Sequence, residues 1–155
     1  MTAPIPVPDT DSAGFWDAAR AGTLAIARCT ACRIWQHPPL ERCRRCGNEM
    51  AFEPVSGDGT VFSFIVVRHP AVPGHEIPYV VAFVELVEQA GLRMTAVVDA
   101  DPDTVAIGMP VRVRMIGIGT DGMQAPEFVP LRRSGTEPAL RSGTEPALRS
   151  GTEPA

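Results

Sequence analysis

Short apolar runs separated by turn residues dominate the chain from Gly57 onward. Runs rich in Val, Phe and Ile cover residues 60–69, 79–88, 92–98, 111–116 and 127–131, with Gly, Pro and Asp between them. β-Branched and aromatic residues in runs of this length are typical of strands. The pattern predicts a mainly β fold of five strands, which favours a small antiparallel barrel such as the OB fold. An SH3-like barrel fits the same pattern.

The first two predicted strands carry apolar residues on both alternating faces. In the first run, one side would carry Val61, Ile65 and Val67, and the other Phe62, Phe64 and Val66. A strand with one solvated face would instead show polar residues on that side. We therefore expect the outside of the barrel to be covered, either by the N-terminal part of the chain or by another protein.

The N-terminal segment predicts an extended start followed by one short helix. Prolines at positions 4, 6 and 8 remove backbone donors and disfavour helix. An Asp-Ser pair then offers an N-cap, Phe15 and Trp16 supply apolar positions, and Gly22 stands where a helix would stop. We expect a helix over residues 12–21.

The C-terminal end is a tandem repeat. The octad RSGTEPAL begins at Arg133 and again at Arg141, and a third copy begins at Arg149 without its last residue. One Leu per octad, among Gly, Pro, Ser and Thr, cannot bury a core. The repeat predicts a disordered tail over residues 132–155 that arose by duplication.

Length and charge narrow the class of protein. With 155 residues and 45% hydrophobic content, the chain suffices for one ordinary domain or a small domain with an appendage. No apolar run approaches the roughly 20 residues of a membrane span, and the N-terminus lacks a signal-peptide pattern, so we expect a cytoplasmic protein without membrane contact. The net charge is −4, which disfavours a general nucleic-acid binder.

All four cysteines lie within eighteen residues, as Cys29, Cys32, Cys43 and Cys46. A reducing cytoplasm disfavours disulfides, and two Cys-x-x-Cys turns provide the four thiolates of a closed tetrahedral zinc site. A closed shell leaves no position for water or substrate, so we expect a structural Zn²⁺. Rubredoxin-type iron would use the same ligands and would make the chain an electron carrier.

Arginines surround the predicted metal centre. Gly47 follows the second Cys pair and suits a left-handed turn, whereas Arg33 holds the matching place after the first pair. Residues 28–46 contain five arginines and one glutamate. These arginines either compensate an anionic metal centre or form a basic patch for a phosphorylated ligand such as coenzyme A.

Several motifs in one order carry a family resemblance. They are FW at 15–16, GTLAIARCTAC at 22–32, HPPLERCRRCG at 37–47, SGDGTVFSFIVVRH at 56–69, PYVVAFVEL at 78–86 and GMPVRV at 108–113. In this order the chain resembles the zinc-ribbon and OB-fold family called domain of unknown function 35, over about residues 12–131. Arg33 departs mildly from the pattern of the first Cys turn.

The resemblance implies four parts and an accessory role. The parts are an extended segment and helix at 1–22, a rubredoxin-like zinc ribbon at 23–55, an OB barrel at 56–131 and the tail at 132–155. Family members resemble small subunits that pack on thiolase-superfamily enzymes and help form an acyl-CoA channel. We therefore expect a hetero-oligomer with a larger thiolase-like or lipid-transfer-protein-like subunit, such as a thiolase, an acyltransferase or a steroid side-chain aldolase. The composition, in which every basic residue is Arg and Ala, Val and Pro are abundant, resembles that of a GC-rich bacterium such as an actinobacterium, and this source favours the steroid setting.

The candidate residues outside the metal site follow from this interpretation. Arg33, Arg44, Arg45 and Tyr79 are candidates for the acyl-CoA channel. Phe15 and Trp16 are either the apolar face of a helix packed on its own domain or anchors in a partner. With the cysteines assigned to metal, none of the three histidines stands in a nucleophile–base motif. We therefore expect no catalytic residue in this chain.

A nucleic-acid-binding OB module is the main alternative. OB barrels bind single strands through aromatic platforms and basic grooves. The predicted strands and their ends carry few basic residues, namely Arg68, Arg93, Arg112 and Arg114. Together with the acidic net charge, this scarcity favours an accessory protein.

Overall fold

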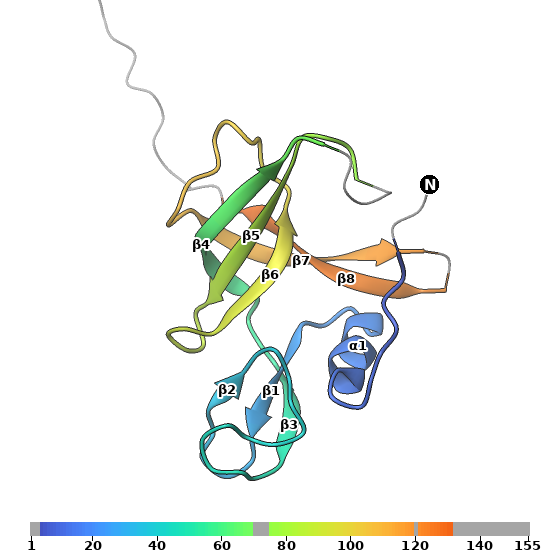
Figure 1. The fold of residues 1–155 in the computed structure, drawn as a ribbon, viewed down its shortest axis with the longest axis vertical. Helices are drawn as coiled ribbons and strands as arrows, with labels where there is room; N and C mark the ends of the chain where they lie inside the picture. The colour runs from blue at the N-terminus through green and yellow to red at the C-terminus, as the bar shows by residue number, and fades with distance from the viewer. Residues whose placement is uncertain (1–3, 70–74, 120, 132–155) are drawn as a thin grey trace, which may run out of the picture.

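The computed structural model describes residues 4–69, 75–119 and 121–131. Within these ranges a short helix, a three-stranded ribbon and a five-stranded barrel follow one another along the chain (Figure 1). The predicted mainly β fold is confirmed. The predicted tail over 132–155 lies outside the described residues.

The ribbon is a small antiparallel sheet that carries the cysteines at one end. Its strands are β1 (Ala25–Cys29), β2 (Trp35–Gln36) and β3 (Met50–Pro54), in the order β2-β1-β3. β1 lies at the centre and is largely buried, whereas β3 is half-buried. The first Cys-x-x-Cys turn therefore begins at the end of the central strand.

The barrel closes through five strands in the order β4-β5-β6-β8-β7. These are β4 (Asp58–Val67), β5 (Tyr79–Leu86), β6 (Arg93–Val98), β7 (Pro110–Ile118) and β8 (Met123–Pro130). Neighbours pair antiparallel except β6 and β8, which pair in parallel. This Greek-key closure is that of an OB barrel. The last two strands are longer than predicted because turn-forming Gly and Pro lie inside them.

The expected distribution of apolar residues on β4 is wrong. The register with β5 shifts between Val61 and Ser63, as a β-bulge does, and this shift changes which side chains point inward. Val61 is buried, whereas Ile65, expected on the same side, is 63% exposed. Phe64 packs against the core. The pattern allowed the N-terminal part of the chain as a cover, but its described residues leave Phe62 45% exposed and Ile65 uncovered as well.

Helix α1 (Ala13–Arg20) occupies the predicted segment but begins differently. Ser12 stands at the N-cap without a side-chain bond to the helix. Its hydroxyl instead bonds Asp9, whose carboxylate also accepts the Ser12 backbone N–H at 2.8 Å. Gly22, with φ of 77°, follows the end of the helix as predicted.

One apolar core joins the helix, the ribbon and the barrel. Phe15 of α1 and Ile26 of β1 belong to the same buried cluster as Val84 and Phe128 of the barrel. α1 packs against β8 and β1, as Figure 1 shows. The shared core places the cysteine end of the ribbon in a defined position below the barrel in this view.

Candidate metal centre

The four cysteine sulfurs form one compact cluster. All four lie within 4.8 Å of one another, with 3.4 Å between the Sγ atoms of Cys29 and Cys46 and 3.6 Å between those of Cys32 and Cys43. None forms a disulfide. Tetrahedral zinc with Zn–S bonds of about 2.3 Å places its sulfurs about 3.8 Å apart. The donor set therefore fits a four-thiolate metal ion.

The two Cys-x-x-Cys turns have matching backbone geometry. The Arg33 N–H donates to the Cys29 carbonyl at 3.1 Å, and the Gly47 N–H donates to the Cys43 carbonyl at 2.9 Å. Arg33 has φ of 62° and Gly47 has φ of 72°. Arg33 thus adopts the left-handed conformation that Gly47 adopts in the second turn. The first turn differs from the family pattern in the type of this residue but not in its backbone conformation.

Nitrogen donors surround the sulfurs. The backbone N–H of Cys32 donates to the Cys29 sulfur, and that of Arg45 to the Cys43 sulfur, each at 3.4 Å. The Asn48 side-chain amide donates to the Cys46 sulfur at 3.4 Å. Hydrogen bonds from Asn48 lower the pKa of the Cys46 thiol to about 6. Such donors favour thiolates, the form that binds a metal.

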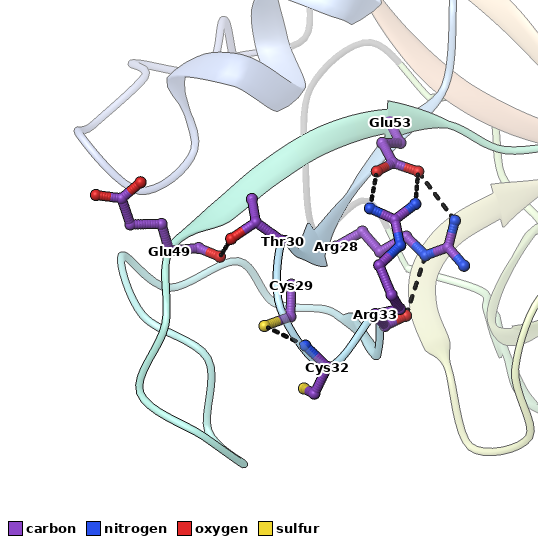
Figure 2. Close-up of polar contacts among 7 residues, drawn as sticks. All are labelled: Arg28, Cys29, Thr30, Cys32, Arg33, Glu49 and Glu53. Atoms are coloured by element: carbon purple, nitrogen blue, oxygen red, sulfur yellow. Dashed lines mark hydrogen bonds and ion pairs between the residues drawn. The ribbon is translucent and has the colours of Figure 1, made fainter.

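A carboxylate braces the first turn from β3. Glu53 binds Arg28 at 3.0 Å and Arg33 at 2.8 Å, and the Arg28 side chain also donates to the Arg33 carbonyl at 3.0 Å (Figure 2). Hydrogen bonds from the two arginines lower the pKa of Glu53. The same figure shows the Thr30 hydroxyl donating to the Glu49 carbonyl at 3.1 Å. Arg33, the residue with the left-handed conformation, is thus bound through both its side chain and its carbonyl.

Gln36 positions the second turn, a role that was not predicted from the sequence. Its side chain is buried, with 1% exposed. Its Nε2 donates to the Arg42 carbonyl at 3.3 Å, and its Oε1 accepts the Arg44 N–H at 2.9 Å. These two backbone groups flank Cys43. A glutamine beside prolines in a hairpin carries no distinctive pattern, so only its burial reveals this role.

A second glutamine ties the ribbon to the barrel. Gln89, in the turn between β5 and β6, accepts the Trp35 N–H at 2.9 Å and donates to the Trp35 carbonyl at 3.1 Å. The Arg28 guanidinium lies 4.7 Å from the centre of the Trp35 ring. The cysteine-bearing ribbon is therefore linked to the barrel by directional bonds as well as by the shared core. In the sequence, this turn indicated only a change of strand.

The structure does not bring the predicted channel residues together. Arg33 is engaged with Glu53, whereas Arg44 and Arg45 are exposed on the second turn and form no ion pair with a described residue. Tyr79 begins β5, at the barrel end remote from the ribbon (Figure 1), and its ring stacks on His75 at 4.8 Å. Their role toward an acyl-CoA stays a prediction.

Phe15 and Trp16 have different surroundings. Phe15 is buried in the common core, and its ring meets the half-buried Trp16 edge-on at 5.0 Å. Both border a depression of about 290 Å³ between helix, ribbon and barrel, together with His37 and Thr95. Burial lowers the pKa of His37. Phe15 thus serves the fold, and a partner contact of Trp16 stays a prediction.

Among the described residues, no histidine is hydrogen-bonded to a side chain that could act with it as a nucleophile–base pair. None of His37, His69 and His75 shares a hydrogen bond with a hydroxyl, thiol or carboxylate of a described residue. In the same part of the chain, no helix has the length and apolar character needed to cross a membrane.

Comparisons with known proteins agree with this architecture. The model of the ChsH2 rubredoxin-like zinc ribbon domain matches residues 16–53, and that of the ChsH2 C-terminal OB-fold domain matches residues 52–115. The two models meet where the ribbon passes into the barrel.

Two curated relatives are hydratase subunits that are much longer than this chain. The chain is 43% identical over 109 residues to a probable enoyl-CoA hydratase alpha subunit of Thermomonospora curvata, and 42% identical over 113 residues to the 3-oxo-4,17-pregnadiene-20-carboxyl-CoA hydratase alpha subunit of Mycobacterium tuberculosis. The matches cover 70% and 72% of this chain but only 34% and 35% of those proteins. The chain therefore spans about a third of their length.

Two further relatives are matched over most of their own length. A DUF35 domain-containing scaffold protein of Methanocaldococcus jannaschii is 39% identical, with 64% of this chain and 72% of that protein covered. A chain in a solved structure described as an Ltp2-ChsH2(DUF35) aldolase is 38% identical, with a TM-score of 0.75 and coverage of 81% of this chain and 98% of that one. The chain belongs to the DUF35 family of zinc-ribbon and OB-fold proteins.

Proposed function

We propose that this chain is a non-catalytic, zinc-binding accessory component that docks on a larger thiolase-superfamily enzyme and helps form its acyl-CoA channel. The favoured setting is a steroid side-chain aldolase. One observation carries the proposal: the chain covers 98% of a DUF35 chain in a solved Ltp2-ChsH2 aldolase at a TM-score of 0.75. A relative described as a scaffold protein supports the accessory role.

The arrangement of the ribbon supports a structural metal. Four thiols converge, and the surrounding bonds from Gln36, Asn48 and Glu53 orient the two turns. When bound, a zinc ion in such a cage supplies folding free energy and cross-links the turns, and it leaves no ligand position for a substrate. The reaction would then belong to the partner. Metal analysis of the purified chain should show one zinc per chain, and visible absorption would instead reveal iron.

A hydratase component is the second candidate, favoured by the two hydratase alpha subunits. In those proteins the matched segment is about a third of the length. If this chain serves a hydratase, the groups that add water to the substrate would lie outside the ribbon and the barrel. Both candidates assign the same accessory task to the ribbon and barrel.

The test uses the larger subunit, defined here as the Ltp2-like protein from the organism that encodes this chain. The two proteins are co-expressed and purified, and cleavage of a steroid β-hydroxyacyl-CoA is measured for each alone and for the mixture. We expect a stable complex and activity that depends on both. Turnover by the purified chain alone, or the absence of any complex with the larger subunit, would contradict the proposal. Hydration of a steroid enoyl-CoA, measured alongside, separates the two candidates.

A further inference from the structure

The outer face of β4 and β5 exposes large apolar side chains. Phe62 is 45%, Ile65 63% and Phe83 51% exposed. The strand register places Phe83 opposite Ser63, and Ile65 opposite Val81, so these residues lie on adjoining positions of one surface. Single exposed apolar residues are ordinary, but a contiguous group on a sheet marks an interaction site.

A depression lies within this group. Its volume is about 350 Å³, and its lining includes Ile65, Val81 and Phe83 with Ser63 and Thr95. Its lining residues belong to three neighbouring strands of the barrel, β4, β5 and β6. The space suits one or two large apolar side chains from a partner, the arrangement in which an anchor residue dominates an interface.

An ion pair lies at the rim of this face. Arg93 binds Glu85 at 2.7 Å, and its guanidinium lies 3.3 Å from the centre of the Phe62 ring. Of the other arginines of the barrel, Arg112 pairs with Asp58 and Arg114 with Asp99, and only Arg68, just after β4, forms no ion pair with a described residue. An oligonucleotide needs free cations to neutralise its phosphates. The exposed aromatics therefore suit a neutral, apolar protein surface better than a nucleic acid.

The face also extends toward the helix. Thr95 of β6 borders both this depression and the one beside Trp16. Helix α1 itself packs on β8 and β1, and Figure 1 shows it beside β8 and apart from β4. The chain's own described elements thus leave a continuous surface from β4 to Trp16 available to a partner.

We propose that the outer face of β4 and β5, centred on Phe62, Ile65 and Phe83, is the surface that docks on the larger subunit, which inserts an uncharged apolar side chain into the depression. This inference rests on the proposed function and specifies the contact. It assigns Trp16 to the edge of the interface and the paired charges of Arg93 and Glu85 to its rim. Because the face is neutral, binding should depend only weakly on salt.

The test compares charged substitutions at exposed positions. Ile65→Glu and Phe83→Glu place a carboxylate at the centre of the face, and Ile107→Glu places one on a similarly exposed residue, 71% exposed, in the loop between β6 and β7. Each variant is checked by zinc content and thermal melting, which these exposed positions should leave near wild type. Affinity for the purified larger subunit is then measured by titration calorimetry at low and high salt.

We expect Ile65→Glu and Phe83→Glu each to weaken binding at least about 30-fold, since they bury an unpaired charge at an anchor position, and Ile107→Glu to change it less than about twofold. If wild type binds and both central variants bind equally well, the inference is overturned while the proposed function stands. If the wild-type chain fails to bind the larger subunit, both the inference and the proposed function are overturned. Loss of a homodimer in the central variants, or tight salt-sensitive binding of a fluorescent oligothymidine to wild type, would also overturn the inference.

Discussion

The ribbon and the barrel reach order by different routes. The barrel buries a row of apolar residues, among them Val61, Val84, Val111 and Phe128, at 0% to 1% exposure. The ribbon beyond β1 buries little apolar surface and relies on four thiols, Gln36 and the Glu53 brace. Small units without a sufficient core need a metal or another cross-link. We therefore expect metal loss to unfold mainly the cysteine end of the ribbon. A core truncation in the barrel should instead lower the stability of the protein without releasing the metal.

Metal removal should have the largest effect. Cys29→Ala, or chelation of the wild type, should unfold the cysteine end of the ribbon, because structural zinc contributes about 10 kcal/mol or more to comparable small sites. The barrel should keep its β structure with a lowered melting temperature, since Ile26 still shares its core. Hydrogen exchange resolved along the chain measures both.

The matched control is a core truncation in the barrel. Val84→Ala should destabilise the whole protein by about 2 to 3 kcal/mol while zinc stays bound at full stoichiometry. If chelation instead left the exchange of ribbon amides unchanged, the metal would not be what orders this region, and the contrast between the two regions would not hold.

Gln36→Ala should come next. The substitution leaves the Arg42 carbonyl and the Arg44 N–H without their partner, at a cost of about 1 to 3 kcal/mol. It should also weaken zinc about 10-fold or more, as loss of groups that orient ligands does. Competition with a chromophoric chelator measures the affinity. Glu41→Ala, at an exposed position in the same hairpin, is the control and should bind zinc as wild type does.

Arg33 allows a finer test of the first turn. Its φ of 62° costs a side-chain-bearing residue about 1 kcal/mol that glycine does not pay. Arg33→Gly and Arg33→Ala both lose the contact with Glu53, so they differ chiefly in backbone conformation. We expect the Gly variant to be more stable than the Ala variant by about 1 kcal/mol in urea denaturation. Equal stability would show that the left-handed conformation is not retained.

The smallest effect concerns the pH dependence of the Glu53 brace. Arg28 and Arg33 lower the pKa of Glu53 below its ordinary value of 4.5. Its contribution to stability is therefore present above pH 4.5 and is lost as the pH falls through the lowered pKa. Glu53→Gln should be slightly less stable than wild type at neutral pH, and the two should converge in acid. A constant difference down to low pH would contradict this assignment.

The convergence of the four thiols was predictable because it depends on the spacing of residues within one short segment. Cys-x-x-Cys spacing places two sulfurs on one side of an ion whatever surrounds the turn, and Gly47 marks the return of the chain. Gln36 and Gln89 were not predictable, because their roles depend on backbone groups that folding brings to them from other segments. The fold class was predictable from five runs of β-forming residues. The runs did not predict that Val61 would point into the core and Ile65 toward the surface.

The amino-acid order by itself determined the cluster of four thiols, the short helix and the succession of ribbon and barrel strands, because each depends on spacing within one segment. Only the tertiary structure decided which apolar residues face outward. The register shift between Val61 and Ser63 and the closure of β4 against β5 and β7 turn Phe62 and Ile65 to the surface. Strand register is a relation between distant segments, and a shift of one residue exchanges the two faces of a strand.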